Sequence, residues 1–189
     1  MEKRHRVFIA INLPEYVKKE LVKYYNNWPE LPAKWTTKDN LHITLEFLGN
    51  LTDIEIADVC QILKKVVQRH KIFQINLNKI IYGPHNKIPP KMIWAEGEKS
   101  KDLFNLKNDL QKSLLEKVSF KSEAREFTPH ITLARILEWR FRQIEPEEIP
   151  EINEIIDLQF TAESIEVVES QLKRGGPQYI VLESHNLNN

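Results

Sequence analysis

The chain has 189 residues, of which 41% are hydrophobic and 29% charged, as is usual for one soluble globular domain spanning residues 1–189. Basic and acidic residues number 27 each, so the net charge is zero and an overall positive field that would hold a long nucleic-acid duplex is excluded. The sequence has neither a signal peptide nor an apolar run long enough to span a membrane, and its single Cys60 cannot form an internal disulfide. We therefore expect a soluble, monomeric, cytoplasmic protein that does not bind membranes.

Hydrophobic periodicity predicts an alternation of strands and helices along the chain. The predicted elements, in order, are a strand at 7–13, a helix at 14–28, a strand at 41–48, a helix at 52–70, strands at 72–82 and 92–95, a helix at 100–118, a strand from 130, an irregular surface segment at 138–154, and strands at 158–172 and 179–182. Thr52 and Ser100 are the expected N-caps of two of the helices. Several connections between strands are too short for parallel crossovers, which indicates an α+β fold with antiparallel or mixed sheets and helices outside.

The helix at 100–118 is expected to bury a stripe of apolar side chains on one face. These side chains are Leu103, Phe104, Leu106, Leu110, Leu114 and Leu115.

One tetrapeptide, His-Ile-Thr-Leu, occurs twice, beginning at His42 and at His130, each time at the head of a predicted strand. Side chains alternate along a strand, so His42 and Thr44 share one face, as do His130 and Thr132. The Ile and Leu residues between them would anchor each strand in the core. Two such strands from a duplicated lobe would bring two imidazoles and two hydroxyls into one polar pocket.

Two imidazoles on opposite sides of a phosphorus atom provide an acid and a base for phosphodiester cleavage. One would take a proton from the attacking water and the other would protonate the departing oxygen, while the threonine hydroxyls donate to nonbridging oxygens. This chemistry requires no metal, and the sequence lacks His-Glu-x-x-His and paired-cysteine spacings. We therefore expect neither a metal nor a cofactor.

The chain resembles the 2H phosphoesterases, and among them the RNA 2′,3′-cyclic phosphodiesterases, also described as 2′-5′ RNA ligase-like proteins. The segments that carry the resemblance are Arg6–Ile11 with Leu13-Pro14, Asn40–Gly49, Ile93–Ala95, Pro129–Arg135 and Gly176-Pro177-x-Tyr179. The resemblance implies a bilobal fold in which two lobes related by a pseudo-twofold axis face a central groove. It also implies hydrolysis of RNA 2′,3′-cyclic phosphate ends to 2′-phosphates, with reverse 2′-5′ ligation as a side activity. The implied partners are RNA with such an end, for example tRNA fragments, or small cyclic nucleotides.

By the same resemblance, His130 would activate water and His42 would protonate the ribose 3′-oxygen. Arg135 would hold the phosphate and Phe47 would stack on a base, a mode that suits single-stranded RNA. Strict strand alternation places Arg135 on the other face of the strand from His130, unless a bulge intervenes. By the same alternation, Phe47 could equally be a core residue.

Three alternative functions remain open from the sequence. One is a 2H enzyme for 2′-5′ oligoadenylate or an ADP-ribose cyclic phosphate, and another is a module that binds nucleotides or RNA ends without turnover. The third, ranked last, is a soluble α+β interaction protein in which the His-Ile-Thr-Leu strands are incidental. Intact His and Thr in both motifs favour an enzyme.

Overall fold

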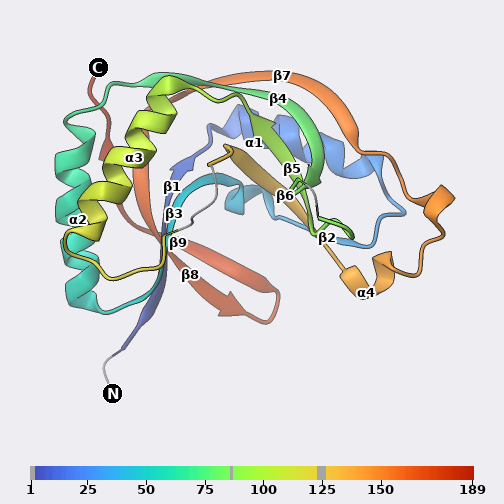
Figure 1. Cartoon of the computed structure of the whole chain (residues 1–189), viewed down its shortest axis with the longest axis horizontal. Helices are drawn as coiled ribbons and strands as arrows, with labels where there is room; N and C mark the ends of the chain where they lie inside the picture. Colours follow the sequence, from blue (N-terminus) through green and yellow to red (C-terminus); the bar gives the residue numbers. More distant parts are fainter. Residues whose placement is uncertain (1–2, 86, 123–126) are drawn as a thin grey trace.

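The fold is built on one curled sheet of nine strands, seen in a computed structural model that describes residues 3–85, 87–122 and 127–189 (Figure 1). The strand order is β7-β4-β5-β6-β3-β1-β8-β9, with β2 paired to β6 outside this path, and the strand pairs in these ladders are antiparallel. The strands are β1 (His5–Asn12), β2 (Ala33–Trp35), β3 (His42–Leu51), β4 (Phe73–Gly83), β5 (Met92–Gly97), β6 (His130–Ile136), β7 (Asn153–Ala162), β8 (Ser164–Lys173) and β9 (Gly176–Asn186).

The strand order has an internal symmetry about its centre, where β3 and β6 are neighbours. On one side β3 is followed by β1, β8 and β9, and on the other β6 is followed by β5, β4 and β7. We call these four-strand units the His42 lobe and the His130 lobe. Each lobe therefore contributes its own His-Ile-Thr-Leu strand to the middle of the sheet.

The two long helices α2 and α3 lie side by side against the outside of the sheet, whereas the short α4 lies beyond the strands (Figure 1). The helical segments are α1 (Glu15–Lys23), α2 (Asp53–Val67), α3 (Lys101–Leu115) and α4 (Glu138–Phe141), with 3₁₀ turns at η1 (Tyr24–Asn27), η2 (Lys38–Asn40) and η3 (Pro146–Glu148). Thr52 forms a capping box with Glu55, and the Ser100 hydroxyl accepts from the Leu103 amide, which confirms both expected N-caps.

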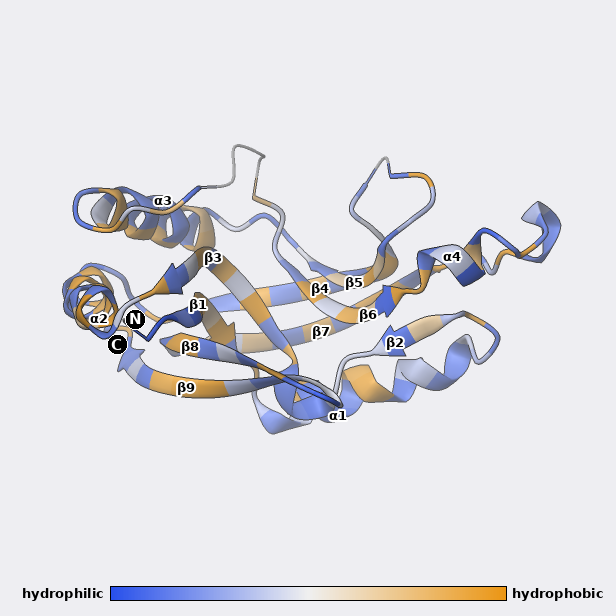
Figure 2. Cartoon of the chain, turned by 90° about the horizontal axis from the view of Figure 1, so that it is seen from below, coloured by the Kyte–Doolittle hydropathy of each residue, from blue (hydrophilic) through white to orange (hydrophobic). Residues whose placement is uncertain are grey.

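The main core lies on the face of the central strands that carries Ile43, Leu45, Ile131 and Leu133, all of them buried. Apolar and polar residues alternate along the strands, as the hydropathy colouring in Figure 2 shows, so the opposite face carries the histidines and threonines. A second, small cluster on that opposite face contains Phe8, Ala10 and Val168, with Tyr179 packed against it. The side chains of the two motifs thus stand beside aromatic neighbours.

The predicted elements agree with the observed ones in type and order, with several differences. The helix predicted to run to Trp28 ends at Lys23 and continues as the η1 turn, and β2 was not predicted. The surface segment at 138–154 contains α4, whose Phe141 is buried. The run predicted as one strand over 158–172 is divided between β7, at the edge of the His130 lobe, and β8 in the His42 lobe. Hydropathy alone does not show that a strand changes partners halfway.

The prediction for the α3 stripe is wrong at two positions. Phe104 and Leu115 are each 52% exposed, whereas the other four side chains are buried. Helical periodicity allows a stripe about this wide, but α3 packs on β3, β4 and α2 along a narrower line.

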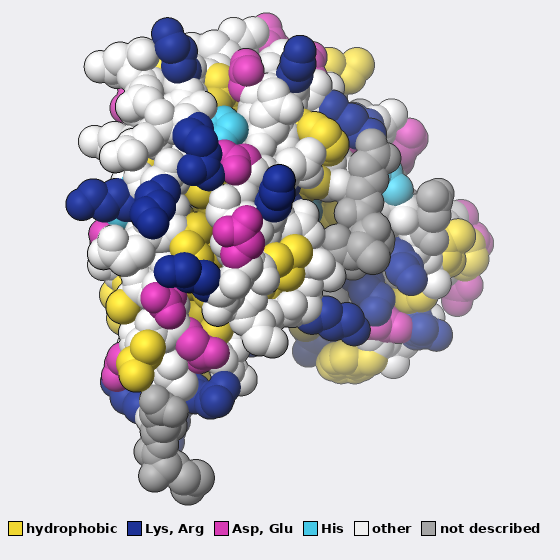
Figure 3. All heavy atoms as spheres, turned by 60° about the vertical axis from the view of Figure 1, so that its left-hand side comes forward, with side chains coloured by type: hydrophobic (Ala, Val, Ile, Leu, Met, Phe, Trp, Pro, Cys, Tyr) yellow, Lys and Arg dark blue, Asp and Glu magenta, His cyan; other side chains and the backbone are white. Residues whose placement is uncertain are grey.

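Basic and acidic side chains are interspersed over the face that carries α2 and α3 (Figure 3), in keeping with the zero net charge. No helix in the described part of the chain is sufficiently long and apolar to cross a bilayer.

Candidate active site

The two motif strands meet at a single residue pair, Ile43 with Ile131. In an antiparallel pair, continuing this register by one residue each way sets His42 across from Thr132 and Thr44 across from His130. All four side chains are half-buried, and the two isoleucines point into the core beneath them. The fold thus brings the two predicted His and Thr pairs together on one face of adjacent strands.

Both strands carry a β-bulge at the last residue of the tetrapeptide. In β3, Ala10 pairs with Thr44 and Ile9 with Glu46, so Leu45 is the extra residue. The neighbouring pair of Phe8 with Phe47 then returns Phe47 to the face of Thr44, since Phe8 and Ala10 are two residues apart on β1. Phe47 is 51% exposed and its ring centroid lies 6.1 Å from that of Phe8. The bulge settles the parity of Phe47 in favour of the histidine face.

In β6, Trp94 pairs with Thr132 and Ile93 with Ala134, so the extra residue is Leu133. Met92 pairs with Arg135, and Met92 and Trp94 are two residues apart on β5, which returns Arg135 to the face of Thr132. We call the shared face, made by His42, Thr44, Phe47, His130, Thr132 and Arg135, the motif face. The bulge that would bring Arg135 to the histidine side is therefore present.

His42 is held on both sides of its ring. Nδ1 donates to the Asn40 carbonyl at 2.7 Å, which leaves Nε2 as the acceptor of the neutral ring, and Nε2 lies 2.9 Å from the Thr44 hydroxyl. Phe8 and Tyr179 enclose the ring, with centroids at 4.9 and 5.2 Å. Nε2 is thereby set as the atom that would exchange a proton with a substrate.

Burial of the His42 ring lowers its pKa from 6.5 to about 4. The hydrogen bond to Asn40 opposes this shift, and the positive charges of His130, Lys18 and Arg135 add to it. His42 is therefore a neutral imidazole near pH 7, and it lies within electrostatic reach of His130 and Arg135.

His130 has a matching backbone anchor and a different neighbour. Its Nδ1 donates to the Thr128 carbonyl at 2.7 Å, and its ring stacks on Trp94 with centroids 3.8 Å apart and planes 22° apart. Behind the indole lies Gly83, where an added Cβ would come within 2.2 Å of the ring. Glycine at this position lets the backbone support Trp94, which in turn supports His130.

The contact of Trp94 with His130 was not predicted, although Trp94 lies in the segment Ile93–Ala95 that carries the family resemblance. Trp94 is buried on the motif face. Alternation along β5 assigns Trp94 to the motif face only once its pairing with Thr132 is known, and the sequence does not show that pairing. Phe8, Tyr179 and Lys18 are further neighbours of His42 and were not among the predicted site residues.

Within the described residues, no three or more His, Cys, Asp or Glu side chains are grouped so that they could hold a metal ion. The expectation that neither metal nor cofactor takes part stays a prediction.

Residues 19–174 match the 2′-5′ RNA ligase superfamily. The chain belongs to this superfamily. A relative from Methanocaldococcus jannaschii, named RNA 2′,3′-cyclic phosphodiesterase, is 27% identical over 177 residues, which cover 94% of this chain and 98% of the relative.

Solved structures agree with this membership. The crystal structure of TT0787 from Thermus thermophilus has a TM-score of 0.83 at 28% identity and covers 96% of this chain and 97% of its own. E. coli LigT complexed with 3′-AMP shares the fold with a TM-score of 0.79 at 22% identity, over 99% of this chain and all of LigT. The expected 2H phosphoesterase fold is therefore confirmed.

Proposed function

We propose that the protein hydrolyses the 2′,3′-cyclic phosphate ends of RNA to 2′-phosphates, using His42 and His130 as its acid-base pair. The observation that carries the proposal is the placement of both motifs on one face of adjacent strands, each histidine with Nδ1 fixed by a backbone carbonyl. The relative from M. jannaschii, which spans nearly the same length and is named for this activity, supports the choice of substrate.

In the proposed reaction, water attacks phosphorus in line with the bond to the ribose 3′-oxygen, and that bond breaks. One imidazole Nε2 takes a proton from the water and the other gives a proton to the departing 3′-oxygen, which becomes a hydroxyl. Thr44, Thr132 and Arg135 would donate hydrogen bonds to the nonbridging oxygens, where charge is held in the transition state. Exchange of protons with solvent restores the two histidines, so no metal or cofactor is required.

The roles of the two histidines have two competing assignments. The family resemblance gives His130 as the base and His42 as the acid. The lowered pKa of His42 favours the reverse in the free protein, because a neutral imidazole accepts a proton. A substrate with a good leaving group, such as a p-nitrophenyl phosphodiester, needs no acid, so the variant of the acid histidine should regain activity on it while the variant of the base should not.

We also propose that Phe47 stacks on the base of the terminal nucleotide. Its exposure, its position on the motif face and its contact with Phe8 support this role over a core role. The reverse reaction, in which a 5′-hydroxyl replaces water and forms a 2′-5′ bond, uses the same groups and is proposed as a side activity.

The direct test is incubation of the protein with adenosine 2′,3′-cyclic phosphate in EDTA, with chromatographic separation of 2′-AMP and 3′-AMP. We expect 2′-AMP, with no effect of the chelator. Loss of activity on chelation, or a 3′-AMP product, would contradict the mechanism.

The same assay separates the alternatives. A panel that includes 2′-5′ oligoadenylate and ADP-ribose 1″,2″-cyclic phosphate would identify a related enzyme by its preference. Binding of nucleotides without turnover of any of these substrates would instead identify a binding module.

A further inference from the structure

Glu96 is a buried carboxylate on the motif face that the proposed reaction does not use. It pairs with His130 in the ladder between β5 and β6, and with Lys79 in the ladder between β4 and β5. Residues directly opposite each other in antiparallel strands point to the same face of the sheet, so the Glu96 side chain lies on the histidine side and away from the main core. A carboxylate is rarely buried without partners, which makes its contacts informative.

Two basic side chains hold Glu96 in place. His85 donates from Nε2 to one carboxylate oxygen at 2.6 Å, and Lys79 Nζ lies 3.1 Å from the other. Lys79 is on the neighbouring strand β4, whereas His85 belongs to the loop that follows β4. The bond to Glu96 therefore fixes a loop residue to the sheet beside the second motif.

From this position His85 meets Trp94. The two rings are nearly perpendicular, at 86°, with centroids 6.3 Å apart, which is within the range in which aromatic rings attract each other. Trp94 also stacks on His130 and packs against Gly83. Among the residues that the structure describes, none accepts a hydrogen bond from the buried indole Nε1. The position of the indole is therefore set by what packs against it, and His85 is one of these neighbours.

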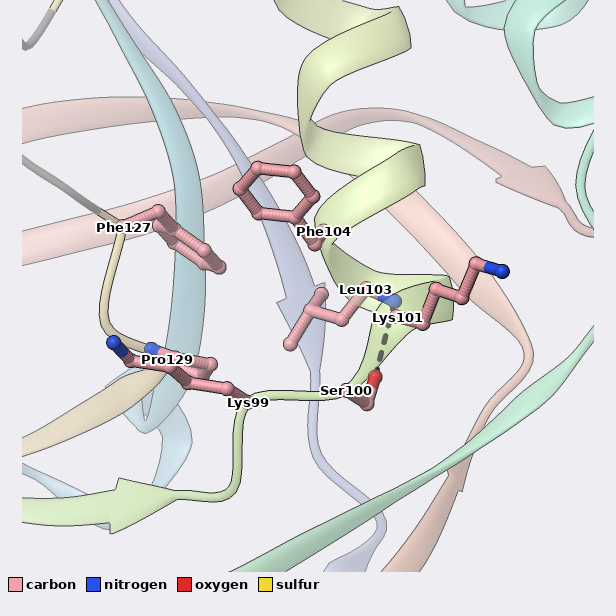
Figure 4. A pocket seen from close by; sticks show the side chains of 7 residues that line it. All are labelled: Lys99, Ser100, Lys101, Leu103, Phe104, Phe127 and Pro129. Atoms are coloured by element: carbon pink, nitrogen blue, oxygen red, sulfur yellow. Dashed lines mark hydrogen bonds between the residues drawn. The ribbon is translucent and has the colours of Figure 1, made fainter.

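The segment that leads into His130 is not packed on all sides. Phe127 and Pro129 line an open pocket of about 330 Å³, together with Phe104 of α3, on the side of the sheet that α3 covers (Figure 4). Between these two wall residues, the Thr128 carbonyl accepts from Nδ1 of His130. The backbone thus anchors one atom of the imidazole, and the stacked indole sets the tilt of its plane.

We propose that His85 and Glu96 are positioning residues of the active site. The bond between them holds His85 against Trp94, and Trp94 in turn holds the His130 ring in the orientation from which Nε2 exchanges a proton. The proposal rests on the proposed function. Neither positioning residue takes part in proton transfer or touches the substrate.

The kinetic test measures His85→Ala and Glu96→Ala on adenosine 2′,3′-cyclic phosphate. Each variant should lower kcat by about tenfold at unchanged KM, because a displacement of about 1 Å at a catalytic group costs up to about a hundredfold and substrate binding is untouched. The double variant should be no slower than the slower single variant, since the two residues act as one unit. Glu96→Gln, which keeps an acceptor oxygen for His85, should retain more activity than Glu96→Ala.

Lys79→Met is the matched control, because it removes the other ion pair of the same carboxylate and leaves the His85 bond in place. Its kcat should stay near that of the wild type. Urea unfolding of all the variants separates this role from a purely structural one, which would lower the unfolding midpoint without changing kcat of the folded protein.

The orientation of His130 can also be followed without turnover. Stacking on the indole shifts the ring protons of His130 upfield in the proton NMR spectrum through the ring current. In both alanine variants these shifts should move toward those of an unstacked histidine, whereas in the lysine variant they should not. The His42 ring is the internal control in the same spectra, because its neighbours are Phe8 and Tyr179.

If the wild type hydrolyses no cyclic phosphate, the proposed function fails, and the NMR shifts of His130 still decide on the positioning role. Unchanged shifts in both alanine variants overturn that role. So do an unchanged kcat in either of them, a rise in KM at constant kcat, losses that multiply in the double variant, or an equal loss in Lys79→Met.

Discussion

The His42 and His130 lobes present the same motif through the same backbone device but surround it differently. In both, a bulge follows the threonine, and the residue five positions after the histidine returns to the motif face, as Phe47 in one lobe and Arg135 in the other. His42 is enclosed by Phe8 and Tyr179, whereas His130 stacks on Trp94. The backbone symmetry places two equivalent imidazoles, and the unequal side chains give them different chemical surroundings.

The side chains at the two equivalent positions, 47 and 135, also differ in chemistry. Under the proposed function, Arg135 would offer a guanidinium to phosphate oxygens, and Phe47, at the equivalent position, would offer an aromatic face to a base. The symmetric strand order thus carries different side chains at the equivalent positions 47 and 135.

The largest expected effect tests whether the two lobes are equal partners in catalysis. His42→Ala and His130→Ala should each lower kcat by about 10² to 10⁴, since each removes one proton-transfer group. The double variant should be little worse than either single one, because the two groups act in one transition state. Steady-state rates on adenosine 2′,3′-cyclic phosphate measure both effects. A single variant with nearly full activity would show that one lobe suffices.

The second prediction concerns the burial of His42. Its pKa of about 4 in the folded chain lies below the unfolded value of 6.5, so between these pH values the unfolded chain binds the proton and the folded chain does not. The free energy of unfolding should therefore fall by up to about 3 kcal/mol from this group as the pH falls from 6.5 to 4. Urea unfolding of the wild type and His42→Gln at several pH values measures the difference. An identical pH dependence in both proteins would contradict this prediction.

The third prediction compares one glycine in each lobe. Gly83→Ala should destabilise the fold by about 1–3 kcal/mol and disturb His130, because its Cβ would overlap the Trp94 ring. Gly49→Ala, at the end of β3, has open space around its Cβ and a φ of +79°, so it should cost about 1 kcal/mol from backbone strain alone and leave activity intact. Thermal unfolding and kcat separate the two, and equal activity losses would refute the role of Gly83 behind Trp94.

The smallest expected effect is at Phe47. Phe47→Ala should raise KM for the cyclic mononucleotide by about fivefold to tenfold through the lost stacking, with kcat and stability nearly unchanged since the ring is exposed. Phe47→Tyr serves as the control that keeps the ring. A drop in the unfolding midpoint without a change in KM would assign Phe47 to packing instead.

Much of the fold was predictable because its signals are local. The two N-caps and the strands that begin at His42 and His130 follow from short-range patterns, and the structure confirms them. It also confirms four of the six residues predicted for the buried stripe of α3. The errors fall where distant segments decide the outcome. Residues 158–172 form two strands because β7 pairs with β4 and β8 with β1, and Phe104 is exposed because of the line along which α3 packs.

The sequence by itself determined the pairing of histidine with threonine in each motif, because strand alternation is a property of the chain over three residues. Only the tertiary structure decided that Phe47 and Arg135 share the histidine face and that Trp94 supports His130. The physical reason is that a bulge reverses alternation at a point fixed by hydrogen bonds to a neighbouring strand, and β1 and β5 supply those bonds from far along the chain.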